Sequence, residues 1–180
     1  MSPDQFTVIG ENIHTTRTLR RNGIRATVFE DGTEAVTYRD KNGTICYLTI
    51  PEHFKKTQAY EQGQLKHFQI AVWKGLHGSE REAASGADYV IRESERQIAS
   101  GANFLDLNVD EISHLVNEEK KGMRWLVETV QQVSSIPLSI DSSLTDVIAE
   151  GLAACDSSLG RAMLNSVSLE RIDALELVTE

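Results

Sequence analysis

The sequence has few cysteines and no long apolar run, and both absences narrow the class of protein. Its two cysteines, Cys46 and Cys155, are too far apart for a CxxC motif and too few for a disulfide framework, so we expect reduced thiols. No apolar stretch approaches the ~20 residues that cross a bilayer, and the opening MSPDQFTVIG lacks the charged and apolar regions of a signal peptide. We therefore expect a cytoplasmic protein without a membrane partner.

Long runs of positive charge are also absent. The chain of 180 residues has 18 basic and 27 acidic residues, a formal charge of −9, and no run of lysine or arginine longer than two. Proteins that bind nucleic acid usually carry clustered Lys and Arg, so we expect no nucleic-acid partner. The hydrophobic content of 40% is that of an ordinary globular domain.

From Ser79 onward, predicted helices and short apolar runs alternate. Ser79 and Glu82 have capping-box spacing, and the helical pattern they open ends at Gly101. Apolar runs follow at 103–109, 136–141 and 162–168, separated by helical patterns, of which one starts at Ser143 and another at Leu169. With 6–13 as the earliest strand, the order predicts an α/β fold with four parallel strands.

Residues 18–78 interrupt this rhythm and are predicted to be an insertion. Asp31-Gly32 and Asn42-Gly43 are turn signals between runs rich in β-branched and aromatic residues, which predicts a three-stranded antiparallel meander. The following segment has a helical pattern in two pieces that divide near Gly63. This insertion could cover a pocket, dock a partner, or do neither.

Polar side chains end each predicted parallel strand. The carboxyl ends of parallel strands are where ligands bind in such folds, so the repeated pattern predicts one shared pocket. For any single residue, a structural hydrogen bond is the competing interpretation. The candidate site residues are Asp106, Asn108, Asp141, Ser142, Asn165, Glu11 and Asn12.

The residue types favour a neutral heterocycle with N–H donors, because a carboxylate can accept two such bonds side by side. The sequence has no glycine-rich phosphate loop, no GxSxG motif and no metal-type spacing of His and Cys, so no metal is expected. His14 and His114 could be ligands, proton carriers or simply polar loop residues.

Four motifs, VIGENIHTT, GANFLDLNVDE, IPLSIDSS and AMLNSVS, resemble in order and spacing those of the pterin-binding barrel family. Within it they are most similar to the methyltetrahydrofolate:corrinoid protein methyltransferases, including the folate module of methionine synthase. The resemblance covers residues 7–13 and about 80–180. It implies a (β/α)₈ TIM barrel that binds methyltetrahydrofolate and passes its N5 methyl group to cobalamin on a corrinoid protein or domain.

The same resemblance implies roles for individual residues. Asp141 and Asn165 match residues that hydrogen-bond the pterin, and Asp106 and Asn108 match residues that line the same pocket. No catalytic side chain is implied in this part of the barrel. The family's first-strand motif resembles GERIN, whereas this chain has Asn12 and His14 at the third and fifth positions.

Two alternatives stay open. Dihydropteroate synthase uses the same barrel, but it usually has a glycine-rich loop in place of LDLNVDE and an NDV pattern in place of NSVS. The other alternative is a non-catalytic, pterin-binding or structural half-barrel. A whole barrel takes ~250 residues, so residues 1–180 are expected to form its N-terminal half, an incomplete barrel whose unpaired edge strands would favour a homodimer.

Overall fold

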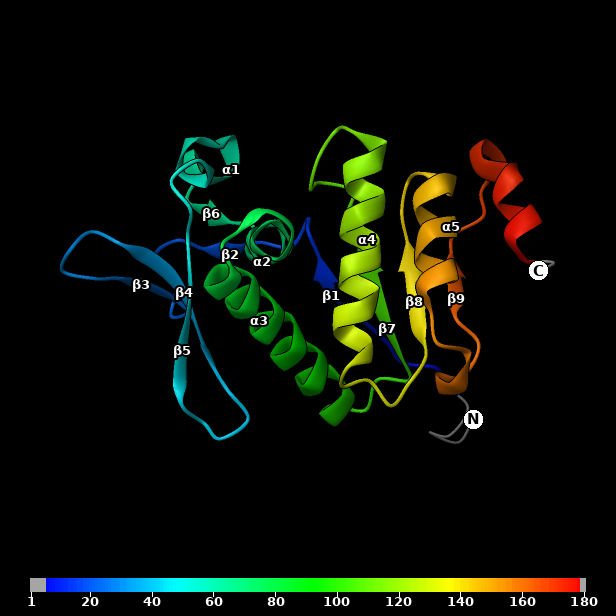
Figure 1. Cartoon of the computed structure of the whole chain (residues 1–180), viewed down its shortest axis with the longest axis horizontal. Helices are drawn as coiled ribbons and strands as arrows, with labels where there is room; N and C mark the ends of the chain where they lie inside the picture. Colours follow the sequence, from blue (N-terminus) through cyan, green and yellow to red (C-terminus); the bar gives the residue numbers. More distant parts are fainter. Residues whose placement is uncertain (1–5, 179–180) are drawn as a thin grey trace.

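Four parallel strands form the central sheet, in the order β1–β7–β8–β9. They are β1 (Ile9–His14), β7 (Phe104–Asn108), β8 (Leu138–Asp141) and β9 (Met163–Asn165). The computed structural model describes residues 6–178, and Figure 1 shows α4 (Val116–Gln131) and α5 (Thr145–Ala154) in front of the sheet. Four parallel strands alternating with helices confirm the predicted α/β fold and are consistent with part of a TIM barrel.

Apolar side chains between the sheet and its helices form the core. Leu105, Leu107 and Ile140 point from the strands toward α4 and α5 and are fully buried. Gly151 of α5 lies so close to the sheet that a Cβ atom there would meet Ile140 at 2.6 Å. Because side chains alternate along a strand, the residues between these leucines must face the other side of the sheet.

The helix predicted from Ser79 is α3 (Glu80–Ala99), and its capping box is present. The Ser79 backbone N–H donates to Glu82 Oε2 at 3.0 Å, which satisfies one of the free donors at the helix start. Gly101, with φ +91°, follows the helix in the left-handed region that glycine adopts most easily.

Two predicted helices differ in the structure, the first in its start and the second in its type. Helix α5 begins at Thr145 rather than at Ser143, because the Ser143 backbone N–H donates to Asp110 in the preceding β7–α4 loop. The last predicted helix is a 3₁₀ helix, η4 (Leu169–Val178), that is broken at Arg171. The guanidinium of Arg171 donates to the Ser142 carbonyl oxygen, and residues 179–180 of that prediction lie outside the described residues.

Residues 18–78 contain the predicted meander, with β3 (Ala26–Val28), β4 (Glu34–Arg39) and β5 (Ile45–Thr49) pairing antiparallel in that order. Gly32 and Gly43 have φ of +80° and +84° in the two turns, as the Asp-Gly and Asn-Gly pairs predict. The remaining elements of the segment are β2 (Leu19–Arg20), η2 (Phe54–Lys56), α1 (Gln58–Glu61), β6 (Gln64–Leu65) and α2 (His67–His77).

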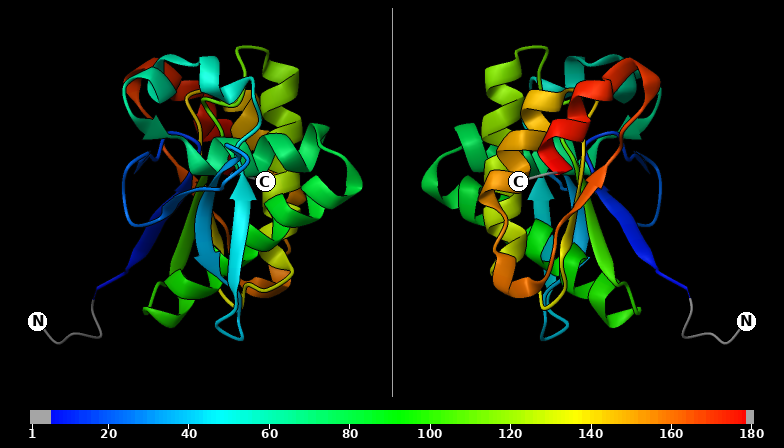
Figure 2. Two further views of the ribbon diagram at one scale, coloured as in Figure 1. Left: turned by 90° about the vertical axis from the view of Figure 1, so that its left-hand side faces the viewer. Right: turned by 90° about the vertical axis from the view of Figure 1, so that its right-hand side faces the viewer.

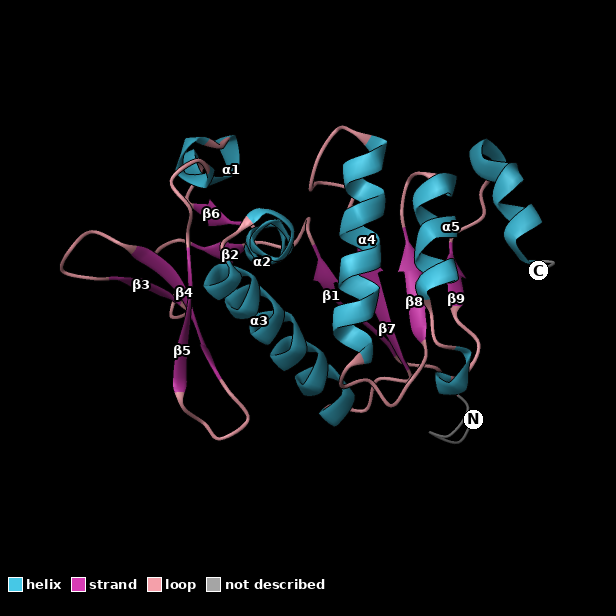
Figure 3. Cartoon of the chain, in the orientation of Figure 1, coloured by secondary structure: helices cyan, strands magenta, loops and turns pink. Residues whose placement is uncertain are grey.

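The meander packs against α3 and lies at the end of the molecule away from β9 (Figures 1 and 2). The rings of Tyr38 and Tyr89 meet edge to face at 5.1 Å, and the Tyr38 hydroxyl bonds Asp88. Figure 3 shows α2 and α3 between the meander and the parallel sheet. Among residues 6–178, no helix is both long and apolar enough to cross a membrane.

Candidate functional site

A row of polar side chains crosses all four parallel strands at their carboxyl ends. His14 is paired with Asn108, Asn108 with Asp141, and Asp141 with Asn165 in the strand register. Residues paired across parallel strands point to the same face, so these four side chains share the face opposite α4 and α5. Asp106 lies on this face as well, two residues before Asn108.

A bulge in β1 decides which of its residues reaches this row. Gly10 pairs with Leu105 and Ile13 with Leu107, so Glu11 and Asn12 together stand opposite the single residue Asp106. The extra residue changes the side on which each later side chain lies and brings His14 opposite Asn108. Without the bulge, Ile13 would take that place.

Asp106 connects His14 and Asn165, the two ends of the row, by hydrogen bonds. His14 Nε2 lies 2.7 Å from Asp106 Oδ2, and Asn165 Nδ2 donates to Asp106 Oδ1 at 3.1 Å. The carboxylate is only 1% exposed and the imidazole 12%. Beside them, Asn108 Nδ2 donates to Asp141 Oδ2 at 2.9 Å. We define the strand-end cluster as His14, Asp106, Asn108, Asp141 and Asn165.

The two carboxylates of the strand-end cluster are electrostatically different. Burial opposes ionisation of Asp106, but hydrogen bonds from His14 and Asn165 outweigh it and hold the pKa below its ordinary value. An ionised Asp106 can only accept, so His14 Nε2 carries the proton of their bond. Burial, together with the neighbouring charge of Asp106, raises the pKa of Asp141 despite the bond from Asn108.

Asp141 retains capacity to bind a ligand. Within the described chain, its only side-chain donor is Asn108, which uses Oδ2 and leaves Oδ1 to accept from a ligand. Asn165 uses its amide nitrogen on Asp106, which leaves its carbonyl oxygen. The strand-end cluster therefore presents a carboxylate and an amide oxygen on adjacent strands, which suits a molecule with an edge of N–H donors.

The other predicted site residues lie elsewhere. Ser142 is fully buried and its hydroxyl donates to Asp110 Oδ1 at 2.6 Å, so it joins two loops rather than facing the row. Glu11 and Asn12 are exposed on the bulge, and His114 is exposed in the β7–α4 loop. The sequence did not single out Asp110, whose backbone N–H donates to Asn108 Oδ1 at 3.0 Å in an Asx turn.

Three members of the strand-end cluster could also offer ligands to a metal ion. One ligand atom from each of His14, Asp106 and Asp141 lies within 4.8 Å of the others, a proximity that the sequence spacing did not suggest. However, His14 Nε2 already donates to Asp106, and that bond would have to break before the nitrogen could bind a cation. In the structure His14 and Asp106 therefore form a hydrogen-bonded pair.

A cavity lies elsewhere in the molecule, away from the strand-end cluster. It has a volume of about 770 Å³ and is lined by residues 20–23, 62–64 and parts of β3 and β4. Arg21 in its wall is already paired with Glu34 at 2.9 Å and stacks on Tyr60. The polar groups in this wall are thus already paired with one another, whereas, among the described residues, Asp141 and Asn165 of the strand-end cluster each keep a free oxygen.

Comparison with known protein families identifies a match in the C-terminal part of the chain. A family model described as "Pterin binding enzyme" matches residues 79–180, which is more than half of the chain. The matched segment contains α3, β7, β8 and β9, and thus Asp106, Asn108, Asp141 and Asn165. His14 and residues 18–78 lie outside it.

Proposed function

The chain belongs to the pterin-binding enzyme family, and we propose that its strand-end cluster binds a reduced pterin and that the enzyme transfers the N5 methyl group of methyltetrahydrofolate to a corrinoid protein. The observation that carries the proposal is the pairing of Asp141 with Asn165 across β8 and β9. It places a carboxylate beside an amide, each with an oxygen that no described donor uses.

The pterin ring offers the complementary groups. Its pyrimidine edge carries N–H donors, and a carboxylate that accepts two of them fixes the ring in its own plane. Asn108 holds Asp141 from one side, so the carboxylate is oriented before the ligand arrives. Asp106 orients Asn165 in the same way, and His14 in turn holds Asp106. A preorganised site of this kind lowers the entropy lost on binding.

Methyl transfer needs positioning more than covalent catalysis. The N5 amine is a poor leaving group, so the N–CH₃ bond breaks only when a nucleophile attacks in line and N5 is protonated or hydrogen-bonded. Reduced cobalt of the corrinoid would supply that nucleophile. The described residues bind and orient the pterin, and we assign none of them as the catalytic acid.

A spectroscopic assay tests the proposal. Cob(I)alamin is mixed with methyltetrahydrofolate and the protein, and we expect the absorbance change of methylcobalamin formation. Asp141→Asn should slow the reaction, whereas Asp146→Asn, an exposed carboxylate on α5, is the matched control. Formation of dihydropteroate from a pterin diphosphate and p-aminobenzoate, without methyl transfer, would instead assign the dihydropteroate synthase reaction.

A further inference from the structure

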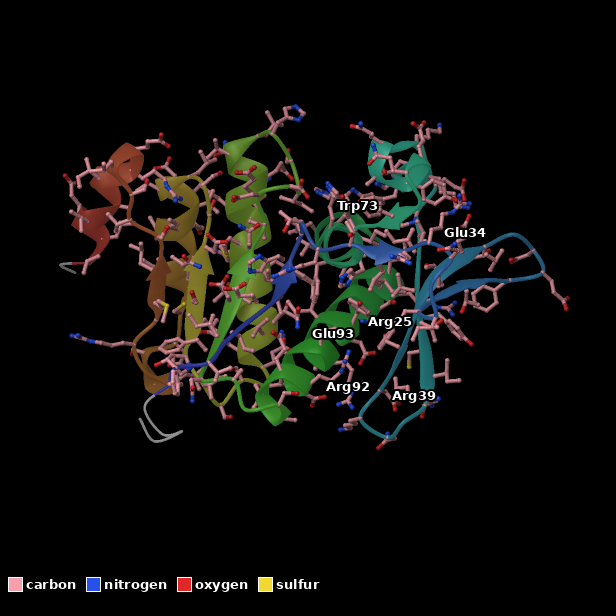
Figure 4. The ribbon with its side chains drawn as sticks, turned by 180° about the vertical axis from the view of Figure 1, so that it is seen from behind. Arg25, Glu34, Arg39, Trp73, Arg92 and Glu93 are labelled. Carbon is pink, nitrogen blue, oxygen red and sulfur yellow. The ribbon has the colours of Figure 1, made fainter. Side chains whose placement is uncertain are left out.

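A second site is suggested by a cavity between α3 and the meander, away from the strand-end cluster. Its volume is about 440 Å³, within the range of small-molecule pockets. Figure 4 shows the labelled side chains Arg25, Arg39, Arg92 and Glu93 between α3 and the β4–β5 hairpin. Together with Arg96, they bring four of the chain's eleven arginines to one cavity, which we call the arginine cavity.

The charged residues that line the arginine cavity are mostly cationic, although the protein as a whole is acidic. Glu93 is the single carboxylate among its lining residues, and Glu95 pairs with Arg92 at 2.8 Å from outside it. Asp40 and Asp88 lie nearby but are occupied, the first by backbone N–H groups of its own turn and the second by a tyrosine hydroxyl. These hydrogen bonds leave both aspartates charged, so they lower the positive potential around the cavity, but within its lining four arginines face Glu93 alone.

Two of the four arginines, Arg25 and Arg96, are held in place by hydrogen bonds to buried residues. Arg25 Nη2 donates to Glu93 Oε1 and to the Tyr89 hydroxyl, both at 2.7 Å. Arg96 Nη1 donates to both oxygens of Glu93 at 3.0 Å. Glu93 is 7% exposed and Tyr89 is fully buried, so these positions are fixed by packing as well as by charge.

Arg39 and Arg92 retain donors for a ligand. Among the described residues, the Arg39 guanidinium donates only to the Gly43 carbonyl oxygen, and Arg92 uses Nε and Nη1. A guanidinium has five N–H donors in a planar fork that matches two oxygens of a phosphate or carboxylate. Arg39 and Arg92 can therefore donate to a ligand, while Arg25 and Arg96 contribute positive charge without contacting it.

Two isoleucines that line the arginine cavity are exposed to solvent. Ile24 is fully exposed and Ile45 is 47% exposed, although both line the cavity. An anion with an organic group would cover these side chains, which adds a hydrophobic contribution to the ionic one. A phosphate monoester carries about −1.5 to −2 charges at neutral pH and three strong acceptor oxygens, so it can accept from both guanidinium groups at once, whereas a single carboxylate has only two oxygens.

We propose that the arginine cavity binds a small organic phosphate, with Arg39 and Arg92 as the phosphate ligands and Ile24 and Ile45 against the organic group. One wall is α3, inside the family match, and the other belongs to residues 18–78, outside it. This gives the insertion a binding role that does not depend on the proposed methyl transfer.

Calorimetric titration with phenyl phosphate tests the proposal on the whole chain. We expect saturable binding that weakens with added salt. Arg39→Gln and Arg92→Gln should each reduce the affinity about tenfold, because each removes charge-assisted hydrogen bonds. Arg39 is exposed and bonds only a turn carbonyl, so its replacement should leave the fold intact, as thermal melting would check. Arg81→Gln, also exposed on α3, is the matched control and should bind as the parent does.

Three results would overturn the proposal. The first is absence of binding by the folded parent chain. The second is equal loss of affinity in Arg81→Gln, which would show unspecific attraction. The third is retained affinity in both folded cavity variants. Benzoate that binds as tightly as phenyl phosphate would refute the preference for phosphate, and inorganic phosphate of equal affinity would refute the contact with the isoleucines.

Discussion

A buried histidine makes the stability of the fold depend on pH. His67, the first residue of α2, is 6% exposed, and its Nδ1 lies 2.7 Å from the Tyr89 hydroxyl. Arg25 already donates to that hydroxyl, so the tyrosine gives its proton to a neutral imidazole. Burial, reinforced by the Arg25 charge, lowers the pKa of His67 to about 3.

The sign of the effect follows from linkage. With a folded-state pKa below the ordinary value of 6.5, the unfolded chain binds a proton that the native chain does not. The stabilisation is complete above the unfolded pKa and decreases as pH falls toward the folded one. Between pH 7 and pH 5, His67 alone should reduce the free energy of unfolding by about 2 kcal/mol. This figure holds for any folded pKa well below 5.

Urea unfolding followed by circular dichroism at several pH values measures this decrease. His67→Asn provides the comparison, because its amide oxygen can still accept from Tyr89 but does not titrate. The parent chain should lose about 2 kcal/mol more than this variant over the same pH range, and His114→Asn, on an exposed loop, should behave as the parent does. Equal pH dependence in the parent and His67→Asn would show that His67 does not cause the loss of stability.

Three further predictions test other parts of the structure. The pKa of Asp141 is raised, and a bound pterin would favour its ionised form. The affinity for a pterin should therefore fall as the pH drops through that pKa, and calorimetry should find no such fall in Asp141→Asn. In Gly86→Ala the new Cβ would lie 2.5 Å from the Ala71 carbonyl oxygen, so this change should lower the free energy of unfolding in urea by about 1–3 kcal/mol. Gly122→Ala, whose Cβ would have no neighbour closer than 3.6 Å, should not, and equal losses in the two variants would contradict the close contact between α2 and α3. Partial burial raises the pKa of the Cys155 thiol to about 11, so iodoacetamide should label it more slowly in the native chain than in urea at neutral pH; equal labelling of Cys155 in both states, located by peptide mapping, would contradict this.

The sequence predicted the repeating part of the fold because local signals and burial agree there. The apolar runs around Leu107, Ile140 and Leu164 are strands, and the Ser79–Glu82 capping box starts a helix. The start of α5 was wrong because the Ser143 N–H binds Asp110 of another loop. A contact between two loops that are distant in sequence leaves no local pattern.

The strand-end cluster was predicted in large part. Asp106, Asn108, Asp141 and Asn165 come together because parallel strands in register align their ends. Glu11 and Asn12 do not join them, since the bulge in β1 replaces them with His14. A bulge depends on pairing with β7, so it could not be read from the first strand alone. The contact between His14 and Asp106 was therefore missed.

A pterin site at the strand ends is tested by the affinity of the protein for methyltetrahydrofolate, measured by calorimetry for the parent chain and for Asp141→Ala. If Asp141 accepts the pterin N–H groups, the parent should bind and the variant should lose about 1–3 kcal/mol of binding free energy, because those donors would be left unpaired. Asp146→Ala, on the exposed side of α5, should retain the parent affinity. Absence of binding by the parent, or unchanged affinity in a folded Asp141→Ala protein, would contradict a pterin site at the strand ends.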